Sequence, residues 1–158
     1  MKKNILLVSL LASLAFSVSA ASISNITASG ANPEKGHLIE HIADGKPGTR
    51  WAIPNKGWVE FELASNTELK NFLIIPFKGD QRRLKFDVEY SLDNQTWKPL
   101  TSAAKQTNLK AKNGEIFTFS PVKAKYVKFN VYGTDVNHWS AINEIQFNSA
   151  KKVEHVAL

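Results

Sequence analysis

A short turn between two apolar runs, residues 79–82 (GDQR), is the part of the chain best suited to bind a polar ligand. Gly79 frees the backbone there, and Asp80, Gln81, Arg82 and Arg83 are displayed at the tip. A guanidinium fork such as that of Arg82 can bind a carboxylate or a pair of vicinal hydroxyls. The alternative is a solvated loop that simply carries charge. Other parts of the chain are needed to choose between a binding turn and a solvated loop.

The two runs beside this turn have the pattern of paired strands. Residues 72–77 are almost wholly apolar, whereas Phe86, Val88 and Tyr90 alternate with charged residues, as in a half-buried strand. Together they predict two strands of an antiparallel sheet, with the turn at its rim.

Similar runs recur along the chain, separated by Gly, Asn, Pro, Asp and Ser. They span residues 23–28, 58–63, 69–77, 84–90, 115–119, 125–132 and 142–147. The only helical candidate, residues 37–43, is at most a couple of turns. The spacing predicts an all-β fold, a β-sandwich or jelly roll, whose core comes from the inward faces of two sheets.

The ends of the chain differ from its centre. Residues 1–20 combine Lys2 and Lys3, an apolar stretch and small residues up to Ala20, which is typical of a cleavable secretory signal. An uncleaved membrane anchor would need a longer apolar stretch. With no cysteine, a disulfide framework is excluded. We therefore expect a signal peptide (1–20), one binding domain (21–148) and a flexible C-terminal tail (149–158).

The charge is modestly basic. The formal net charge is +6, and removal of Lys2 and Lys3 with the signal leaves +4. For an exported protein this suits an acidic polysaccharide or an anionic surface better than nucleic acid. Ordinary solubility charge is an equally good explanation of the composition.

Three further blocks, set beside the GDQR turn, carry a resemblance to a known family. They are residues 42–51 (IADGKPGTRW), 58–63 (WVEFEL) and 124–147 (AKYVKFNVYGTDVNHWSAINEIQF). In this order they resemble the discoidin, or coagulation factor 5/8 C-terminal, domain family. The closest likeness is to its bacterial branch, the family 32 carbohydrate-binding modules, especially those attached to alginate lyases. The resemblance covers about residues 23–148 and implies an eight-stranded antiparallel jelly roll, a structural calcium ion and a shallow sugar site on the loops of one rim.

A calcium site also has a physical argument from the sequence. Asp44 and Thr49 bracket a Pro-Gly turn that could direct oxygen ligands at one hard cation. The resemblance implies that Glu144 adds a second carboxylate and that His41 and Lys46 add their carbonyls. Lys46 departs from the family pattern, and its ammonium would oppose cation binding. Alternatively, Asp44 closes a turn and Glu144 pairs with a basic residue.

By the same resemblance, the sugar-facing candidates are Arg82, Gln81, Asp80, His37, Asn137, His138 and Trp139. Arg82 would bind a uronate carboxylate or hydroxyls, the amides and His37 would bind hydroxyls, and an aromatic ring would stack on a sugar face. Trp139 could instead be a core residue, as we expect for Trp51, Trp58 and Trp97. Arg50 could pair with an acid of the calcium loop, and Arg83 could be solvated charge.

These features favour an exported, non-catalytic carbohydrate-binding protein, periplasmic or secreted, that binds a glycan, possibly a uronate-containing one such as alginate. Its expected partners are a polysaccharide or oligosaccharide and possibly a separate secreted enzyme, with no nucleic acid and no membrane. A surface adhesion protein that binds a host protein or a lipid head group is one alternative. A small polysaccharide lyase, with Tyr132 and His138 as its chemical groups and Arg82 neutralising a uronate, is the less favoured one. The sequence has no familiar nucleophile, metal-hydrolase or phosphate-loop motif.

Overall fold

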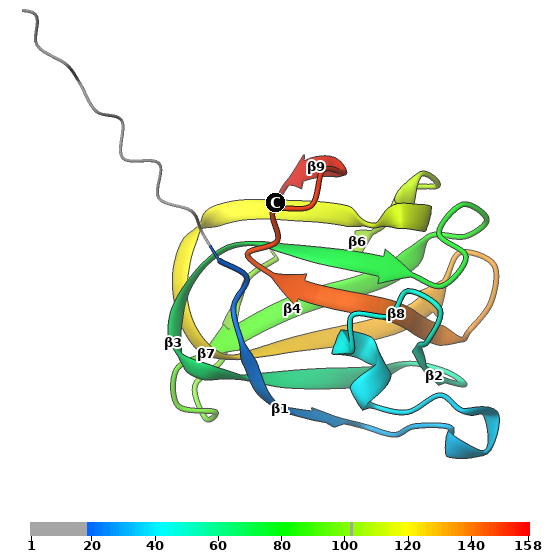
Figure 1. Ribbon diagram of the computed structural model, residues 1–158, viewed down its shortest axis with the longest axis horizontal. Helices are drawn as coiled ribbons and strands as arrows, with labels where there is room; N and C mark the ends of the chain where they lie inside the picture. Colours follow the sequence, from blue (N-terminus) through cyan, green and yellow to red (C-terminus); the bar gives the residue numbers. More distant parts are fainter. Residues whose placement is uncertain (1–18, 102) are drawn as a thin grey trace, which may run out of the picture.

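The computed structural model describes residues 19–101 and 103–158, so nearly all of the predicted signal peptide lies outside the described residues. The described chain is built of β-strands joined by loops and three short 3₁₀ turns (Figure 1). The strands are β1 (Ile23–Ala28), β2 (Trp51–Ile53), β3 (Gly57–Pro76), β4 (Leu84–Ser91), β5 (Lys98–Pro99), β6 (Lys105–Gln106), β7 (Glu115–Thr134), β8 (Ser140–Phe147) and β9 (Glu154–Ala157). The 3₁₀ turns are η1 (Pro33–Lys35), η2 (Glu40–Ala43) and η3 (Ala111–Asn113).

Two long strands, β3 and β7, bend and so contribute to both layers of a sandwich. Their pairing shifts register between Glu62 and Thr67, where the strands cross from one layer to the other. The first half of β3 and the second half of β7 lie with β1, β4, β5 and β6. The remaining halves lie with β2, β8 and β9. One continuous sheet is thus folded over onto itself.

Phenylalanines from both layers fill the space between them. Phe61, Phe86 and Phe129 come from one layer, and Phe72, Phe117 and Phe147 from the other. All six are fully buried. The Phe72 ring lies 5.0 Å from that of Phe129, edge to face, and 5.3 Å from that of Phe117. Such pairs stabilise a core beyond the area they bury.

The predicted all-β sandwich is confirmed. Nine strands are found where the resemblance implied eight, because β5, β6 and β9 are short additions and four of the predicted runs join into β3 and β7. The expected short helical stretch is only η2, a 3₁₀ turn. No helix in the described part of the chain is long and apolar enough to cross a membrane.

The C-terminal segment differs from the expected flexible tail. Residues Glu154–Ala157 form β9, which pairs in parallel with Glu115–Thr118 of β7, and Leu158 N–H donates to the Thr118 carbonyl at 2.8 Å. Val156 and Leu158 pack against the main core. The segment is ordered because β7 offers it a free edge and the core offers it an apolar surface, and neither could be seen in ten residues of sequence.

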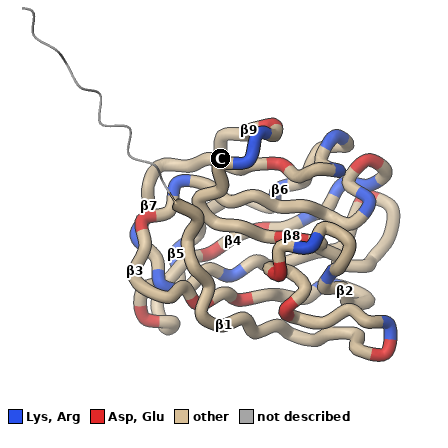
Figure 2. The backbone as a smooth tube through the Cα atoms, viewed as in Figure 1, with Lys and Arg blue, Asp and Glu red and all other residues tan. Residues whose placement is uncertain are grey.

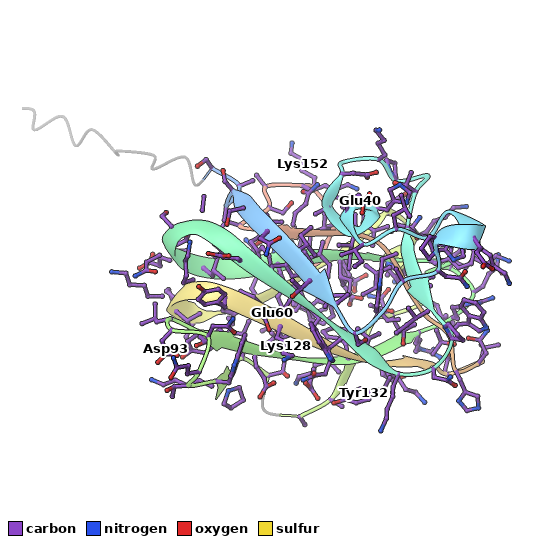
Figure 3. The ribbon with its side chains drawn as sticks, turned by 90° about the horizontal axis from the view of Figure 1, so that it is seen from below. Glu40, Glu60, Asp93, Lys128, Tyr132 and Lys152 are labelled. Atoms are coloured by element: carbon purple, nitrogen blue, oxygen red, sulfur yellow. The ribbon has the colours of Figure 1, made fainter. Side chains whose placement is uncertain are left out.

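The outer face of the first layer is polar and aromatic. Lys128 lies 4.6 Å from the ring of Trp58 and 5.3 Å from that of Trp97, and pairs with Glu60 at 3.6 Å. Figure 3 places Glu60, Lys128 and Tyr132 on one side of the molecule and Glu40 and Lys152 on the other. Trp51, by contrast, is fully buried, as expected of a core residue.

Candidate functional site

Several loops meet at the end of the sandwich opposite the bends of β3 and β7, the right-hand end in Figure 1. They are the segment from η1 to β2, the turn after β3, the 3₁₀ turn η3 and the loop between β7 and β8. In Figure 2 several Lys and Arg positions lie at this end, with acidic positions on some of the same loops.

A pocket of about 290 Å³ opens between these loops. Its floor contains Ala52 of β2 and Ala141 of β8, which stand directly opposite each other in the sheet. Two small side chains at one position of adjacent strands leave room that larger residues would fill. The other lining residues are Lys35, His37, Arg50, Phe77, Arg82, Thr134, Asn137 and Trp139.

The pocket is cationic and carries aromatic rings. The Arg50 guanidinium lies 4.1 Å from the centre of the Phe77 ring and that of Arg82 lies 5.8 Å from it. The Lys35 ammonium lies 5.5 Å from the Trp139 ring. Among the described residues, no Asp or Glu lines this pocket. The arrangement suits an anionic ligand that also has an apolar face.

Two polar atoms of the pocket are buried without a hydrogen-bond partner in the described part of the chain, Nδ1 of His37 and Nε of Arg82. An unpartnered buried polar group costs about 1–3 kcal/mol, which a ligand oxygen could recover. Burial lowers the pKa of His37, and the neighbouring positive charges of Arg50 and Lys35 lower it further. Both effects favour the neutral form of His37 in the free protein.

The turn that carries Arg82 is held in place by close backbone packing. Both Gln81 N–H and Arg82 N–H donate to the Lys78 carbonyl, at 2.9 and 3.2 Å. A Cβ on Gly79 would lie 2.7 Å from the backbone carbon of Ala111 in η3. Gly79 is thus needed because the turn approaches the Ala111 backbone closely. The residue of the turn with a left-handed backbone conformation is Lys78, with φ 54°. Packing against η3 fixes where the turn presents its side chains.

The loop between β7 and β8 is organised by its own polar groups. Gly133 adopts φ 77°, and a Cβ there would lie 2.9 Å from the Asn137 carbonyl. Thr134 N–H donates to that carbonyl at 2.8 Å, and Trp139 N–H donates to Oδ1 of Asn137 at 3.1 Å. These bonds hold Asn137 and Trp139 at the pocket's edge.

A second polar cluster ties the loop after η2 to β8. The Thr49 hydroxyl lies 2.9 and 2.8 Å from the two Asp44 carboxylate oxygens and 2.8 Å from the Lys46 carbonyl. Gly45 N–H donates to Oε2 of Glu144 at 3.2 Å. Burial raises the pKa of Glu144, and the Asp44 carboxylate contributes in the same direction. The pKa of Asp44, by contrast, is lowered. Partial burial alone would raise it, but hydrogen bonds from Lys46 N–H and the Thr49 hydroxyl outweigh that effect. The Glu144 carboxylate is thus bound to the loop that carries Asp44, close enough for the two charges to interact.

A family model for the F5/8 type C domain matches residues 25–145 of the chain. The chain is an F5/8 type C domain. The predicted discoidin family membership is therefore confirmed. A search of curated protein sequences finds no match.

Solved structures similar to this domain are family 32 carbohydrate-binding modules and related proteins. A pectin-binding carbohydrate-binding module shares 49% sequence identity, with a TM-score of 0.83, over 87% of this chain and 98% of that one. The CBM32 of AlyQ, in complex with 4,5-unsaturated mannuronic acid, is 22% identical with a TM-score of 0.76, over 84% of this chain and 100% of that one. A Clostridium perfringens CBM32 in complex with GalNAc-β-1,3-galactose is 20% identical with a TM-score of 0.66, over 79% of this chain and 94% of that one. The last two are similar in fold.

The domain brings four of the seven predicted sugar-facing residues into one pocket: Arg82, His37, Asn137 and Trp139. Asp80 and Gln81 instead line a second pocket on the other side of the turn, and Asp80 pairs with Lys112 at 3.3 Å. His138 is exposed and is not among the residues that line either pocket. Adjacent residues of a tight turn point in different directions, so Asp80, Gln81 and Arg82 do not line the same pocket although they belong to one sequence motif.

Sequence reasoning missed Lys35 and Phe77, and for Arg50 it considered only an acid of the calcium loop as a possible partner. Arg50 stacks on Phe77 and has no acidic partner in the described part of the chain. Phe77 ends an apolar run without alternation, so the sequence carried no sign that its ring would leave the core; in the structure it is half-buried. Arg83 was considered solvated charge, but its guanidinium and backbone N–H both bind Asp135, at 3.0 and 2.7 Å.

The arrangement considered for a lyase does not form around this pocket. The Tyr132 hydroxyl donates to Asp87, and neither Tyr132 nor His138 lines the pocket that contains Arg82. That hydrogen bond, with partial burial, raises the pKa of Tyr132 to about 12. A phenol held protonated in this way is a poor base for abstracting a proton.

Proposed function

We propose that this domain is an exported, non-catalytic carbohydrate-binding protein that binds a uronate-containing glycan in the pocket between η1, the turn after β3 and the loop before β8. The observation that carries the proposal is the convergence of Lys35, Arg50 and Arg82 on a pocket that no acidic residue of the described chain lines. The 49% identical pectin-binding module supports an acidic glycan of the pectin type. Alginate, the candidate suggested by the sequence, is the second glycan to test.

Each lining residue has a physical role in this proposal. Arg82, whose Nε lacks a partner in the described chain, donates to the uronate carboxylate, and Lys35 and Arg50 add positive charge. Trp139 and Phe77 offer ring faces for the apolar face of the sugar. His37 and Asn137 bind hydroxyls. A few such contacts on an open surface give weak binding for one sugar, on the order of micromolar to millimolar.

Affinity electrophoresis of residues 21–158 in gels containing polygalacturonate, alginate or a neutral glucan tests the proposal. We expect retardation by an acidic polymer only, and a loss of about tenfold or more in affinity for Arg82→Ala, because a charge-assisted hydrogen bond is lost. Lys123→Ala, at the far end of the molecule, is the matched control for the loss of one positive charge. Retardation by the neutral glucan, or an Arg82→Ala protein that migrates like the wild type, contradicts the proposed site.

We also propose a structural calcium ion in the cluster of Asp44, Thr49 and Glu144, with the carbonyls of His41 and Lys46 as further ligands. The donor set fits the ion, because the Asp44 carboxylate and the Lys46 carbonyl lie within hydrogen-bond reach of the Thr49 hydroxyl, and calcium takes oxygen ligands. The Glu144 carboxylate reaches the same loop, where it accepts a hydrogen bond from Gly45 N–H. Lys46 is exposed and forms no ion pair with Asp44 or Glu144, so its ammonium does not occupy the cluster. A bound ion would relieve the repulsion between the carboxylates and fasten the loop to β8.

Thermal unfolding with calcium or with a chelator tests the ion. A ligand that binds only the folded state stabilises it by about 2.7 kcal/mol at a concentration 100 times its dissociation constant. We expect Tm to rise with calcium in the wild type and to stop responding in Glu144→Gln. Glu154→Gln, on the exposed part of β9, should respond like the wild type. An unchanged Tm in the wild type removes the calcium site from the proposal.

Export and partnership complete the proposal. Cleavage after residue 20 predicts a mature protein that begins at Ala21, which N-terminal sequencing of protein from the periplasm and the medium can test. A solved structure of AlyQ joins a CBM32 to an alginate lyase domain in one chain, of which this chain covers 32%. Here the proposed partner is a separate secreted enzyme that acts on the same glycan.

A further inference from the structure

A second pocket, of about 400 Å³, adjoins the first one and is also rich in lysine. Lys78, Lys112 and Lys151 line it, from the turn after β3, from η3 and from the segment before β9. Asp80 is the acidic residue of the lining and is already paired with Lys112. The remaining lining residues are Pro47, Ile75, Pro76, Phe77, Gly79, Gln81, Asn113 and Asn143. The net charge of this pocket is therefore positive.

The two pockets share one wall. Phe77 lines both, while Arg82 belongs to the first and its neighbour Gln81 to the second. The ammonium of Lys78 lies 5.6 Å from the Phe77 ring, on which Arg50 of the first pocket is stacked. Because Gly79 packs against the Ala111 backbone, the turn and η3 hold the two pockets in a fixed relation.

The second pocket also contains a hydrogen-bond acceptor without a donor in the described part of the chain. Asn143 donates through Nδ2 to the Pro47 carbonyl at 2.7 Å, which fixes the orientation of its amide. Its Oδ1 is buried and has no partner in the described part of the chain. A sugar hydroxyl is a donor of suitable size, and the surrounding lysines suit a carboxylate. The first pocket has the same combination of positive charge and unpartnered polar atoms.

We propose that the two pockets form one extended site, which binds an internal stretch of a polyuronate chain laid across Phe77 rather than a single terminal sugar. This inference rests on the proposed function, because it assigns the length and charge of the glycan that the site accepts. A chain with a carboxylate on every sugar would place negative charge in both pockets at once. Each exposed lysine adds little alone, so the second pocket contributes through the sum of its charges.

Calorimetric titration with galacturonate oligomers, from the dimer to the octamer, tests the proposal with a double variant. A longer oligomer can bind in more positions along its chain, which raises its apparent affinity even at a short site. In the wild type we expect affinity to rise with chain length by more than this statistical increase. In Lys112→Ala/Lys151→Ala the gain from dimer to octamer should fall on the order of tenfold. Lys110→Ala/Lys152→Ala, which removes the same charge from exposed neighbours that do not line the pocket, should keep the gain. Lys112→Arg/Lys151→Arg should restore it.

The length gain should also shrink at about 1 M salt, where the Debye length falls to about 3 Å. Two results would overturn the extended site and leave the first pocket intact. One is a wild-type affinity that does not depend on oligomer length; the other is an equal gain of affinity with length in Lys112→Ala/Lys151→Ala and in Lys110→Ala/Lys152→Ala. If no oligomer of any length binds the wild type, the proposed function itself fails. Asn143→Ala gives an independent check, because it should reduce the gain without changing charge.

Discussion

At the scale of single residues, the site depends on groups whose hydrogen-bonding capacity the protein leaves unused. His37, Arg82 and Asn143 each keep a buried polar atom without a partner in the described chain, and all three line the two adjoining pockets. Most buried polar groups in proteins are paired, so such atoms gathered at one rim indicate a surface built for a ligand. A fourth such atom in the described chain, Nδ1 of His41, lies outside both pockets, in the 3₁₀ turn η2. By contrast, Arg83 is paired with Asp135 through both its backbone N–H and its guanidinium.

His37 predicts a pH dependence of binding. Burial and the charges of Arg50, Lys35 and His41 hold its pKa below the ordinary 6.5 in the free protein. A bound carboxylate would favour the protonated ring and raise this pKa, so binding takes up a proton. Affinity therefore rises as pH falls through the pKa of the bound state and levels off below that of the free protein, by up to tenfold for each unit by which binding raises the pKa. Titrations in buffers of different ionisation enthalpy measure this uptake. His37→Gln should bind without it, and equal uptake in that variant would contradict the assignment.

At the scale of elements, the strand β9 closes an edge of the sheet and covers part of the core. Parallel pairing with β7 satisfies backbone groups that would otherwise face water, and it covers an edge that could pair with another chain. The strand lies outside both pockets, so its contribution is to stability and solubility rather than to recognition.

Removal of residues 154–158 should lower the free energy of unfolding by about 1–3 kcal/mol, because Val156 and Leu158 leave the core and their apolar surface returns to water. Urea unfolding of the shortened and full-length proteins measures the difference. His155→Ala, at an exposed position of the same strand, should cost less than about 0.5 kcal/mol. A truncated protein as stable as the full-length one would mean that β9 contributes nothing to folding.

At the scale of the whole molecule, the two layers are joined by aromatic packing as well as by the bent strands. The Phe72 ring lies within 6.1 Å of four others, Phe86, Phe117, Phe119 and Phe129, drawn from both layers. The first pocket is lined by residues from both layers, so its geometry depends on this packing.

Phe72→Ala should therefore destabilise the protein by about 3–5 kcal/mol, because it opens a cavity between the layers. This is a large part of the stability of a typical domain, so Phe72→Leu, which keeps most of the volume, should give a smaller and measurable loss. Leu92→Ala, at a side chain that is 51% exposed, is the control and should change little. Denaturant unfolding decides, and a loss below about 1 kcal/mol for Phe72→Ala would show that the layers do not depend on this ring.

The sequence by itself determined the fold class and the family. Alternating apolar residues fix which side chains face inward, and this local rule is visible without coordinates, as the burial of Phe86 and Val88 confirms. It also pointed to Arg82 and Trp139 as candidates, because a charged turn and a loop aromatic stand out from a strand pattern, and both residues line the first pocket. The calcium ligands and the signal peptide stay predictions.

Only the tertiary structure decided which residues share the site. Ala52 and Ala141 lie 89 positions apart, and their pairing across two strands leaves the space that the pocket occupies. The sequence left open that Arg50 pairs with an acid of the proposed calcium loop, yet the fold stacks it on Phe77. The order of β9 likewise depends on an edge of β7 that lies far back along the chain. Pockets and edges are made of residues distant in sequence, so their composition follows from packing rather than from any local pattern.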